Sequence, residues 1–155
     1  MRTVAFVSNY INHHQIPFSE EMRQRLGDGY AFIQTEAMEE ERVRMGWDTG
    51  AEALPYVHEY RREKALCERL LSESDVVIYG GAEEPETEAL FQERVKSRRL
   101  SFRYSERIYK TGQWKAISPR GLCRKYREHT RFRRYPVYLL CAGGYVASDF
   151  HLVGA

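Results

Sequence analysis

The stretch that decides the fold runs from residue 62 to residue 95 and reads REKALCERLLSESDVVIYGGAEEPETEALFQERV. At its centre residues 76–79, VVIY, form a continuous apolar run of strand length, which is typical of a strand covered on both faces. Residues 62–71 before it and 86–95 after it place apolar side chains at helical spacing. Helix, buried strand and helix in succession indicate a parallel sheet with helices on both faces.

The same alternation extends over the rest of the 155 residues. The expected strands are 3–8, 30–35, 56–59, 75–80, 100–104 and 137–142. The expected helices are 15–26, 62–71, 86–95, a basic helix from Ser118-Pro119 to about Arg134, and a last one that begins at Ala147. Because crossovers between parallel strands are right-handed, the pattern predicts a doubly wound, mostly parallel, Rossmann-like α/β sandwich. Ligands bind at the carboxyl ends of such strands, where two long loops, 36–55 and 105–117, are expected.

Size and composition fit one globular domain covering residues 1–155, with 43% hydrophobic and 30% charged residues. The chain has no apolar run long enough for a membrane-spanning helix and no signal-peptide pattern, so we expect a cytoplasmic protein. Its three cysteines, Cys67, Cys123 and Cys141, are far apart, which favours reduced thiols over a disulfide framework or a zinc site. The apolar last residues, 152–155, suggest a chain cut before a further domain.

The net charge of +2 conceals a division of charge along the chain. Residues 1–93 carry 9 Lys or Arg against 19 Asp or Glu, whereas residues 94–134 carry 15 Lys or Arg against only Glu106 and Glu128. Such asymmetry favours contact with something anionic, and the expected basic helix predicts peripheral contact with an anionic membrane at its inner face. A solvated helix face explains the same pattern. Nucleic-acid binding is disfavoured, because no RNA-binding signature accompanies the basic residues. The arginines expected on one broad face of the helix are Arg120, Arg124, Arg127, Arg131 and Arg134.

The first candidate site is residues 8–17, SNYINHHQIP, which begin where the first strand is expected to end. This run of amides, a hydroxyl and imidazoles suits hydrogen bonding to a sugar or phosphate. One of the two adjacent histidines is expected to face the crevice above the sheet as a catalytic group, because neighbouring side chains cannot both point into one apolar layer. The alternative is a helix cap at Asn12 with idle, exposed histidines. The candidate catalytic residues are His13 and His14, and the candidate binding residues are Asn9, Tyr10, Asn12 and Gln15.

Two later strand ends supply further candidates. Ser105 and Glu106 follow the fifth expected strand, and Glu106 lies in a basic field that should hold it ionised and ready to accept hydroxyl hydrogen bonds. An ion pair of Glu106 with a neighbouring arginine that only orders the loop is the alternative. Gly143 and Tyr145 follow the sixth expected strand, where small residues let a ligand approach or a helix pack.

Several common motifs are absent from the sequence. A Gly-x-Gly-x-x-Gly after the first strand, a P-loop, and the Asp-x-Asp pair that holds a metal-bound nucleotide are all missing. The sequence therefore predicts neither a metal site nor a bound cofactor.

The chain resembles bacterial glycosyltransferases of family 4 over essentially its whole length. The resemblance rests on several segments in order: residues 8–17; Thr35-Glu36 with Glu40-Glu41-Arg42 and Met45-Gly46-Trp47; residues 75–80; FRYSER at 102–107; Trp114 with Ser118-Pro119-Arg120; and residues 138–142 with Asp149-Phe150. This similarity implies the N-terminal, acceptor-side half of a GT-B enzyme, in which two Rossmann-like domains face each other across a cleft.

The resemblance also implies a function. It indicates transfer of a sugar from a nucleotide-sugar co-substrate to a hydroxyl acceptor in polysaccharide or glycolipid synthesis. The C-terminal donor-binding domain of those enzymes is absent from these 155 residues, so the chain alone is expected to be inactive. The alternative is a non-catalytic, flavodoxin-like module that binds an anionic ligand or partner, because fold alone does not separate the two functions.

Overall fold

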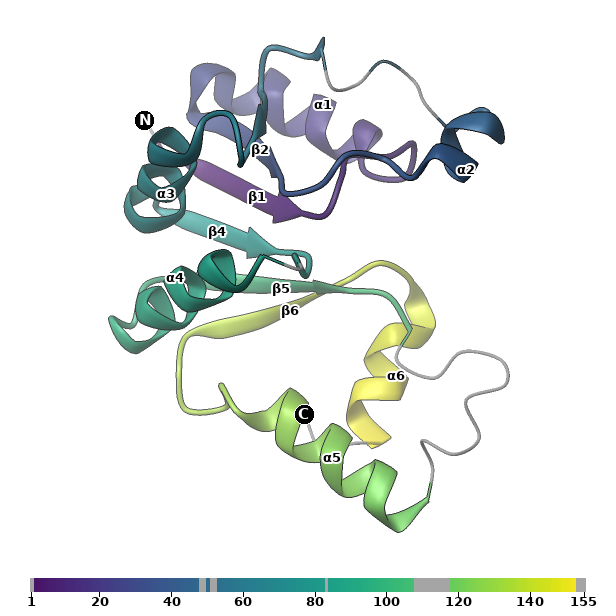
Figure 1. Cartoon of the computed structure of the whole chain (residues 1–155). Helices are drawn as coiled ribbons and strands as arrows, with labels where there is room; N and C mark the ends of the chain where they lie inside the picture. The colour runs from purple at the N-terminus through teal and green to yellow at the C-terminus, as the bar shows by residue number, and fades with distance from the viewer. Residues whose placement is uncertain (1, 48–49, 51–52, 83, 108–117, 153–155) are drawn as a thin grey trace.

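The protein forms a six-stranded, all-parallel sheet with helices on both faces (Figure 1). The computed structural model describes residues 2–47, 50, 53–82, 84–107 and 118–152. The expected α/β fold class, Rossmann-like and parallel, is confirmed. The strands are β1 (Val4–Ser8), β2 (Tyr30–Gln34), β3 (Val57–Glu59), β4 (Val76–Tyr79), β5 (Ser101–Ser105) and β6 (Val137–Cys141).

The strand order is β3-β2-β1-β4-β5-β6. β1 pairs in parallel with β2 on one side and with β4 on the other, so the chain builds outward in one direction and then returns to build in the other. This order is that of the dinucleotide-binding sheet and not the 2-1-3-4-5 order of flavodoxin-like sheets. The winding direction reverses between β1 and β4, and ligands of open α/β sheets bind in the crevice outside the strand ends at this point.

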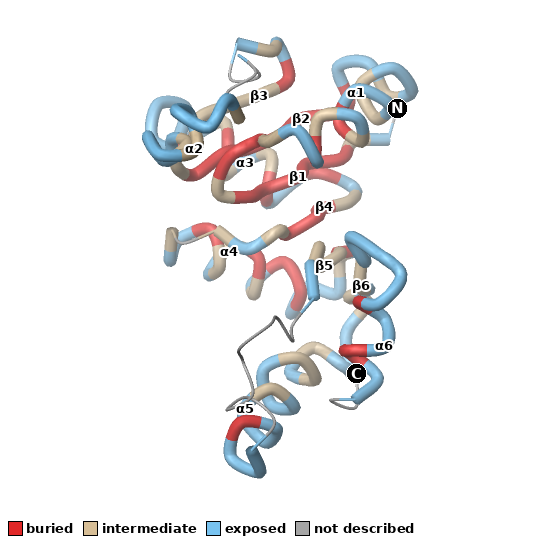
Figure 2. The backbone as a smooth tube through the Cα atoms, turned by 90° about the vertical axis from the view of Figure 1, so that its right-hand side faces the viewer, coloured by how far each residue is buried: buried red, intermediate tan, exposed pale blue. Residues whose placement is uncertain are grey.

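The helices bury two separate cores against the sheet. α1 (Ile16–Leu26) covers a cluster that includes Phe6 and Phe32. α3 (Lys64–Glu73) and α4 (Pro85–Lys96) cover the opposite face, where Val77 and Phe91 are fully buried. The central strands are therefore buried on both faces, as Figure 2 shows, while α5 (Pro119–Thr130) and α6 (Gly144–Leu152) are largely exposed. None of the described helices combines the length and apolarity that crossing a bilayer requires.

Arg94 links three elements on the face covered by α3 and α4. Its side chain is only 4% exposed. Its guanidinium donates to the backbone oxygens of Leu71, Ser72, Asp75 and Leu100, at distances from 2.9 to 3.4 Å. Burial, followed by the nearby charge of Arg99, lowers the pKa of Arg94 to about 10. This member of the basic region is therefore a structural residue rather than part of a basic surface.

The predicted elements differ from the structure most at three places, and the helix expected at 62–71 lies two residues later, at Lys64–Glu73. Each expected strand lies within one residue of the observed strand at both ends. A short helix, α2 (Glu40–Arg44), lies inside the region expected to be a loop. The basic helix α5 is capped by Ser118 as expected but ends at Thr130, so the prediction that it continues to Arg134 is wrong. α6 begins at Gly144, three residues earlier than expected.

The early end of α5 has a physical cause. Phe132 leaves the helical path and packs edge-on against Phe91 of α4, with ring centroids 5.8 Å apart. Arg131 pairs with Glu88 of α4 at 2.5 Å. The expected broad face of five arginines therefore does not form, and only three of them lie on the helix. Residues 108–117, most of the second expected loop, lie outside the described part of the chain.

Candidate functional site

A crevice of about 530 Å³ lies over the carboxyl ends of β1, β4 and β5, at the point where the winding of the sheet reverses. Four separated parts of the chain line it: the segment after β1, the α2 region, the end of β4 and the end of β5. Its lining residues are Ser8, Asn9, Tyr10, Asn12, His14, Gln15, Arg42, Trp47, Gly80, Gly81, Tyr104, Ser105 and Glu106. The structure thus brings together the candidates predicted from the ends of β1 and β5, which are about a hundred residues apart in the sequence.

The segment after β1 is held in place by its own side chains. Gln15 is 5% exposed, and its Nε2 donates to the Ser8 hydroxyl at 3.4 Å while its Oε1 accepts from the Asn12 backbone N–H at 3.3 Å. The Ser8 hydroxyl donates to Asn9 Oδ1 at 3.2 Å. The Asn9 carbonyl accepts from the backbone N–H groups after β2, at 2.9 and 2.8 Å. The polar groups of this loop are therefore fixed relative to the sheet before any ligand arrives.

Asn12 and the histidines occupy the turn that leads into α1. The Asn12 side chain accepts from the His14 backbone N–H at 3.0 Å, and its carbonyl accepts from Gln15 and Ile16. Asn12 therefore stabilises this turn, although α1 itself begins after Gln15. The helix cap at Asn12 that the alternative interpretation expected is wrong, because the N-cap of α1 is Gln15 and no side chain caps this helix. Asn12 also lines the crevice.

The two histidines differ in their surroundings although both are exposed. Their rings lie 3.9 Å apart, centroid to centroid. His14 lines the crevice together with Asn9, Ser105 and Glu106. His13 instead meets the Trp47 ring edge-on at 4.9 Å. Of the two histidines, His14 is therefore the one placed among the crevice groups.

Arg42 and Trp47 form one wall of the crevice, and neither was among the predicted site residues. The Arg42 guanidinium lies 5.0 Å from the Trp47 ring centroid and 5.6 Å from that of Tyr10, and it pairs with Glu39 at 3.0 Å. The hydrogen bond to Glu39 raises the pKa of Arg42, and a weaker contribution comes from the charge of Glu106. Burial raises the pKa of the Tyr10 hydroxyl, against the opposing charge of Arg42. The wall presents aromatic faces and one cation to the crevice.

Gly80 lets the end of β4 approach β1 closely. Its backbone N–H donates to the Val7 carbonyl at 2.7 Å. A Cβ atom at this position would lie 3.0 Å from the Ser8 hydroxyl oxygen and 3.1 Å from both the Phe6 ring and the Val7 carbonyl oxygen. The close approach of the two backbones therefore requires a residue without a side chain at position 80.

The end of β5 supplies the opposite wall. Tyr104 packs against Phe6 with ring centroids 5.5 Å apart, and burial, followed by the charge of Glu106, raises the pKa of its hydroxyl. Ser105 and Glu106 extend the strand into the crevice. Arg107, which was a candidate partner of Glu106, instead makes two contacts of 3.1 Å with the carboxylate of Asp149. That ion pair fixes the chain after β5 to α6.

The remaining candidates, Gly143 and Tyr145, line a second hollow of about 450 Å³ between the ends of β5 and β6. His14, Tyr104 and Glu106 line both this hollow and the crevice, so the two spaces adjoin. Tyr145 is 75% exposed, and its ring lies 5.5 Å from the Arg107 guanidinium. The candidate binding residues thus lie along one continuous edge of the sheet.

Within the described residues no group of three or more His, Cys, Asp or Glu side chains is arranged to hold a metal ion. The chemistry of the crevice is that of hydroxyls, amides, an imidazole, a carboxylate and aromatic faces. Comparison of the chain with protein-family models, with curated proteins and with solved structures finds no significant match in any of the three.

Proposed function

We propose that the chain is the acceptor-side half of a GT-B glycosyltransferase resembling bacterial family 4, which transfers a sugar from a nucleotide-sugar to a hydroxyl acceptor. The observation that carries the proposal is the convergence of hydrogen-bonding groups on one crevice at the winding reversal of the sheet. The resemblance of the segments in order along the chain is the second support, and it names polysaccharide or glycolipid synthesis as the setting.

The lining of the crevice suits a neutral, hydroxyl-rich ligand. Amide groups of Asn9 and Asn12 and the carboxylate of Glu106 offer both donors and acceptors, as sugar hydroxyls require. The rings of Trp47 and Tyr104 supply flat apolar surfaces beside them. The described lining has one cation, Arg42, and its guanidinium is already paired with Glu39, so the crevice offers no concentrated positive charge to a phosphate.

His14 has the position of a group that orients or deprotonates the attacking hydroxyl. In sugar transfer the acceptor oxygen attacks the anomeric carbon, the bond from that carbon to the nucleotide phosphate breaks, and the hydroxyl proton leaves to a base. An imidazole is the side chain whose ordinary protonation equilibrium best suits such a base near neutral pH. Glu106 on the opposite wall accepts a hydroxyl and so fixes the acceptor against His14.

In this proposal the donor is held by a second domain, so residues 1–155 are expected to bind acceptor sugars without turning over nucleotide-sugars. Binding is measured on an array of uncharged and charged oligosaccharides with the labelled chain. Glu106→Gln should weaken sugar binding about tenfold, because Gln keeps an oxygen acceptor but loses the charge, and hydrogen bonds to charged groups contribute about 1.5–3 kcal/mol against about 0.5–1.5 kcal/mol for neutral ones. Glu128→Gln, which changes the other acid of the basic region on an exposed surface of α5, is the matched control and should bind normally.

Two results would overturn the proposal. The first is absence of binding to every sugar on the array. The second is turnover of nucleotide-sugar by the chain alone at a rate typical of whole enzymes, since a site with one wall does not position two substrates.

A further inference from the structure

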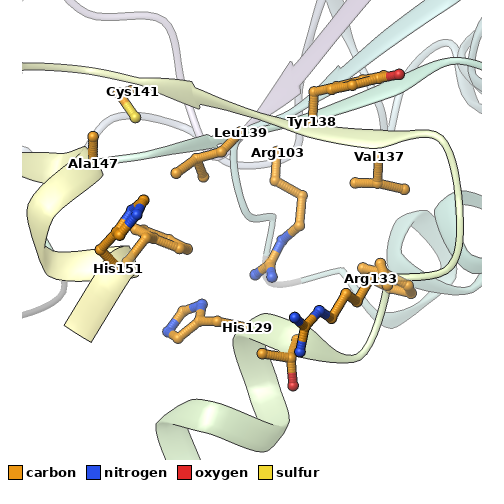
Figure 3. Close-up of a pocket in the computed structure, with 12 residues that line it drawn as sticks. Arg103, His129, Arg133, Val137, Tyr138, Leu139, Cys141, Ala147 and His151 are labelled. Carbon is orange, nitrogen blue, oxygen red and sulfur yellow. The ribbon is translucent and has the colours of Figure 1, made fainter. Parts of the chain in front are cut away.

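A second cavity, of about 460 Å³, lies under α5 on the face of the sheet formed by β5 and β6 (Figure 3). It shares no lining residue with the crevice or with the adjoining hollow. Its walls are mainly apolar and include Phe132, Leu139 and Phe150. A space of this size with few polar groups is typical of a site for a small organic molecule.

Arg103 extends into this cavity from the middle of β5. Figure 3 shows its side chain crossing the space between β6 and α5, with the guanidinium directed toward His129. Within the described residues Arg103 makes no hydrogen bond or ion pair, and its nearest aromatic partner is Phe132, whose ring centroid is 6.0 Å away. The nearby carboxylate of Glu88 is already held by Arg131 at 2.5 Å. The carboxylates of Glu88 and Glu128 act on the guanidinium by charge alone, and neither forms an ion pair with it. The guanidinium is therefore a cation largely removed from water without a directly bonded counter-charge.

Besides Arg103, the cavity is lined by the half-buried side chain of His129 and by polar side chains at its exposed rim. His129 packs edge-on against Phe150 at 4.7 Å, and its Nδ1 is buried without a hydrogen-bond partner in the structure. Burial lowers the pKa of His129, and burial, followed by the charge of Arg131, also lowers that of Arg103. Arg133 and His151 lie at the exposed rim. The part of the lining that the structure describes contains no carboxylate.

We propose that this cavity binds a small organic anion, with its carboxylate on the Arg103 guanidinium and its apolar body against Phe132, Leu139 and Phe150. Removing a guanidinium from water without a partner is unfavourable, and an anion that supplies two hydrogen bonds in the plane of the fork offsets this. The apolar walls exclude a ligand that is polar throughout, such as a sugar phosphate. At about 30 Å³ for each water-sized group, the cavity holds on the order of 15 non-hydrogen atoms.

Decanoate matches this description in size and charge, and calorimetric titration of the full 155-residue chain with decanoate tests the proposal. Binding should be saturable with one molecule per chain, and 1-decanol and decyltrimethylammonium should bind at least tenfold more weakly. Arg103→Met, which keeps the stem and removes the charge, should weaken decanoate binding at least tenfold. Arg120→Met removes the same charge from the exposed start of α5 and should leave binding unchanged. Ala147→Phe keeps Arg103 but fills the cavity from α6, and it should abolish binding.

Thermal melts without ligand separate a binding role of Arg103 from a structural one. The Arg103→Met variant should melt at the same temperature as the unmodified chain or higher, because the substitution removes an unpaired, desolvated charge. A lower melting temperature for Arg103→Met, equal binding of decanol, or the same loss of binding in Arg103→Met and Arg120→Met would each overturn the proposal. These results do not depend on sugar binding in the crevice, so the two proposals fail separately.

Discussion

Replacing Gly80 with alanine tests the geometry that creates the crevice. The added methyl group would meet the Ser8 hydroxyl oxygen at 3.0 Å and the Phe6 ring and Val7 carbonyl oxygen at 3.1 Å. The Val7 oxygen belongs to the central strand, and the Phe6 ring is 1% exposed, so neither can withdraw easily. Overpacking of this kind destabilises by about 1–3 kcal/mol, and the reduced freedom of the unfolded chain offsets about 0.4–1 kcal/mol of it.

We therefore expect Gly80→Ala to lower the free energy of unfolding by about 0.5–2 kcal/mol, which lowers Tm by about 1–8 °C for a chain of this size. Gly144→Ala is the matched control, because a Cβ there meets nothing within 4 Å and the residue begins α6. It should leave the stability unchanged or raise it. Urea denaturation monitored by circular dichroism measures both variants. Equal stabilities for the two variants would refute the close contact between β4 and β1.

Ser118→Ala removes the side chain that accepts a hydrogen bond from a backbone N–H at the start of α5. The free energy of unfolding, measured by urea denaturation, should fall by about 0.5–2 kcal/mol. An unchanged denaturation midpoint would contradict the role of Ser118 as the helix cap. Burial raises the pKa of the Cys67 thiol to about 12, so only roughly 10⁻⁴ of it is thiolate at pH 8. A thiol reagent should therefore label the exposed Cys123 and Cys141 in the folded chain, and it should label Cys67 only after unfolding. Labelling of all three thiols in the folded chain would disprove the buried position. The chain should cosediment with anionic liposomes at low salt, and binding should fade as salt rises, because each basic side chain near the surface contributes about 1 kcal/mol. Replacing the three arginines of α5, Arg120, Arg124 and Arg127, with glutamine should abolish binding. If the unmodified chain does not sediment at low salt, α5 is a solvated helix.

The strands were predictable because each is a short apolar run between turn signals, and burial on both faces makes such runs continuous. β1 and β4 are the clearest cases: every position of β1 is buried, and so are the last three of the four positions of β4. α2 was not predictable for the opposite reason. It has five residues, none of them buried, and therefore shows no apolar periodicity. The end of α5 was missed because a tertiary contact of Phe132 with Phe91 overrides the local helical pattern.

The candidate site was partly predictable because parallel strands all end at one edge of the sheet, so Asn9 and Ser105 could be expected to meet. Arg42 and Trp47 could not be placed in the same way. Their position depends on how the chain between β2 and β3 folds back, which no local pattern in the sequence specifies. The cavity under α5 was not predicted, because in the sequence Arg103 is one of many basic residues in a basic region. Only the structure shows that its side chain points into the protein.

The measurement that tests the central claim most directly is a nuclear magnetic resonance titration of the isotope-labelled chain with methyl glucoside, methyl galactoside and methyl mannoside. The account predicts that at least one of them shifts backbone signals around Asn12 and Glu106 together, and that UDP alone does not. His14→Ala should weaken this binding at least tenfold, whereas His13→Ala, on the adjacent residue that packs against Trp47, should weaken it little. Shifts confined to other parts of the chain, or UDP shifting the crevice signals in place of the sugars, would contradict the account.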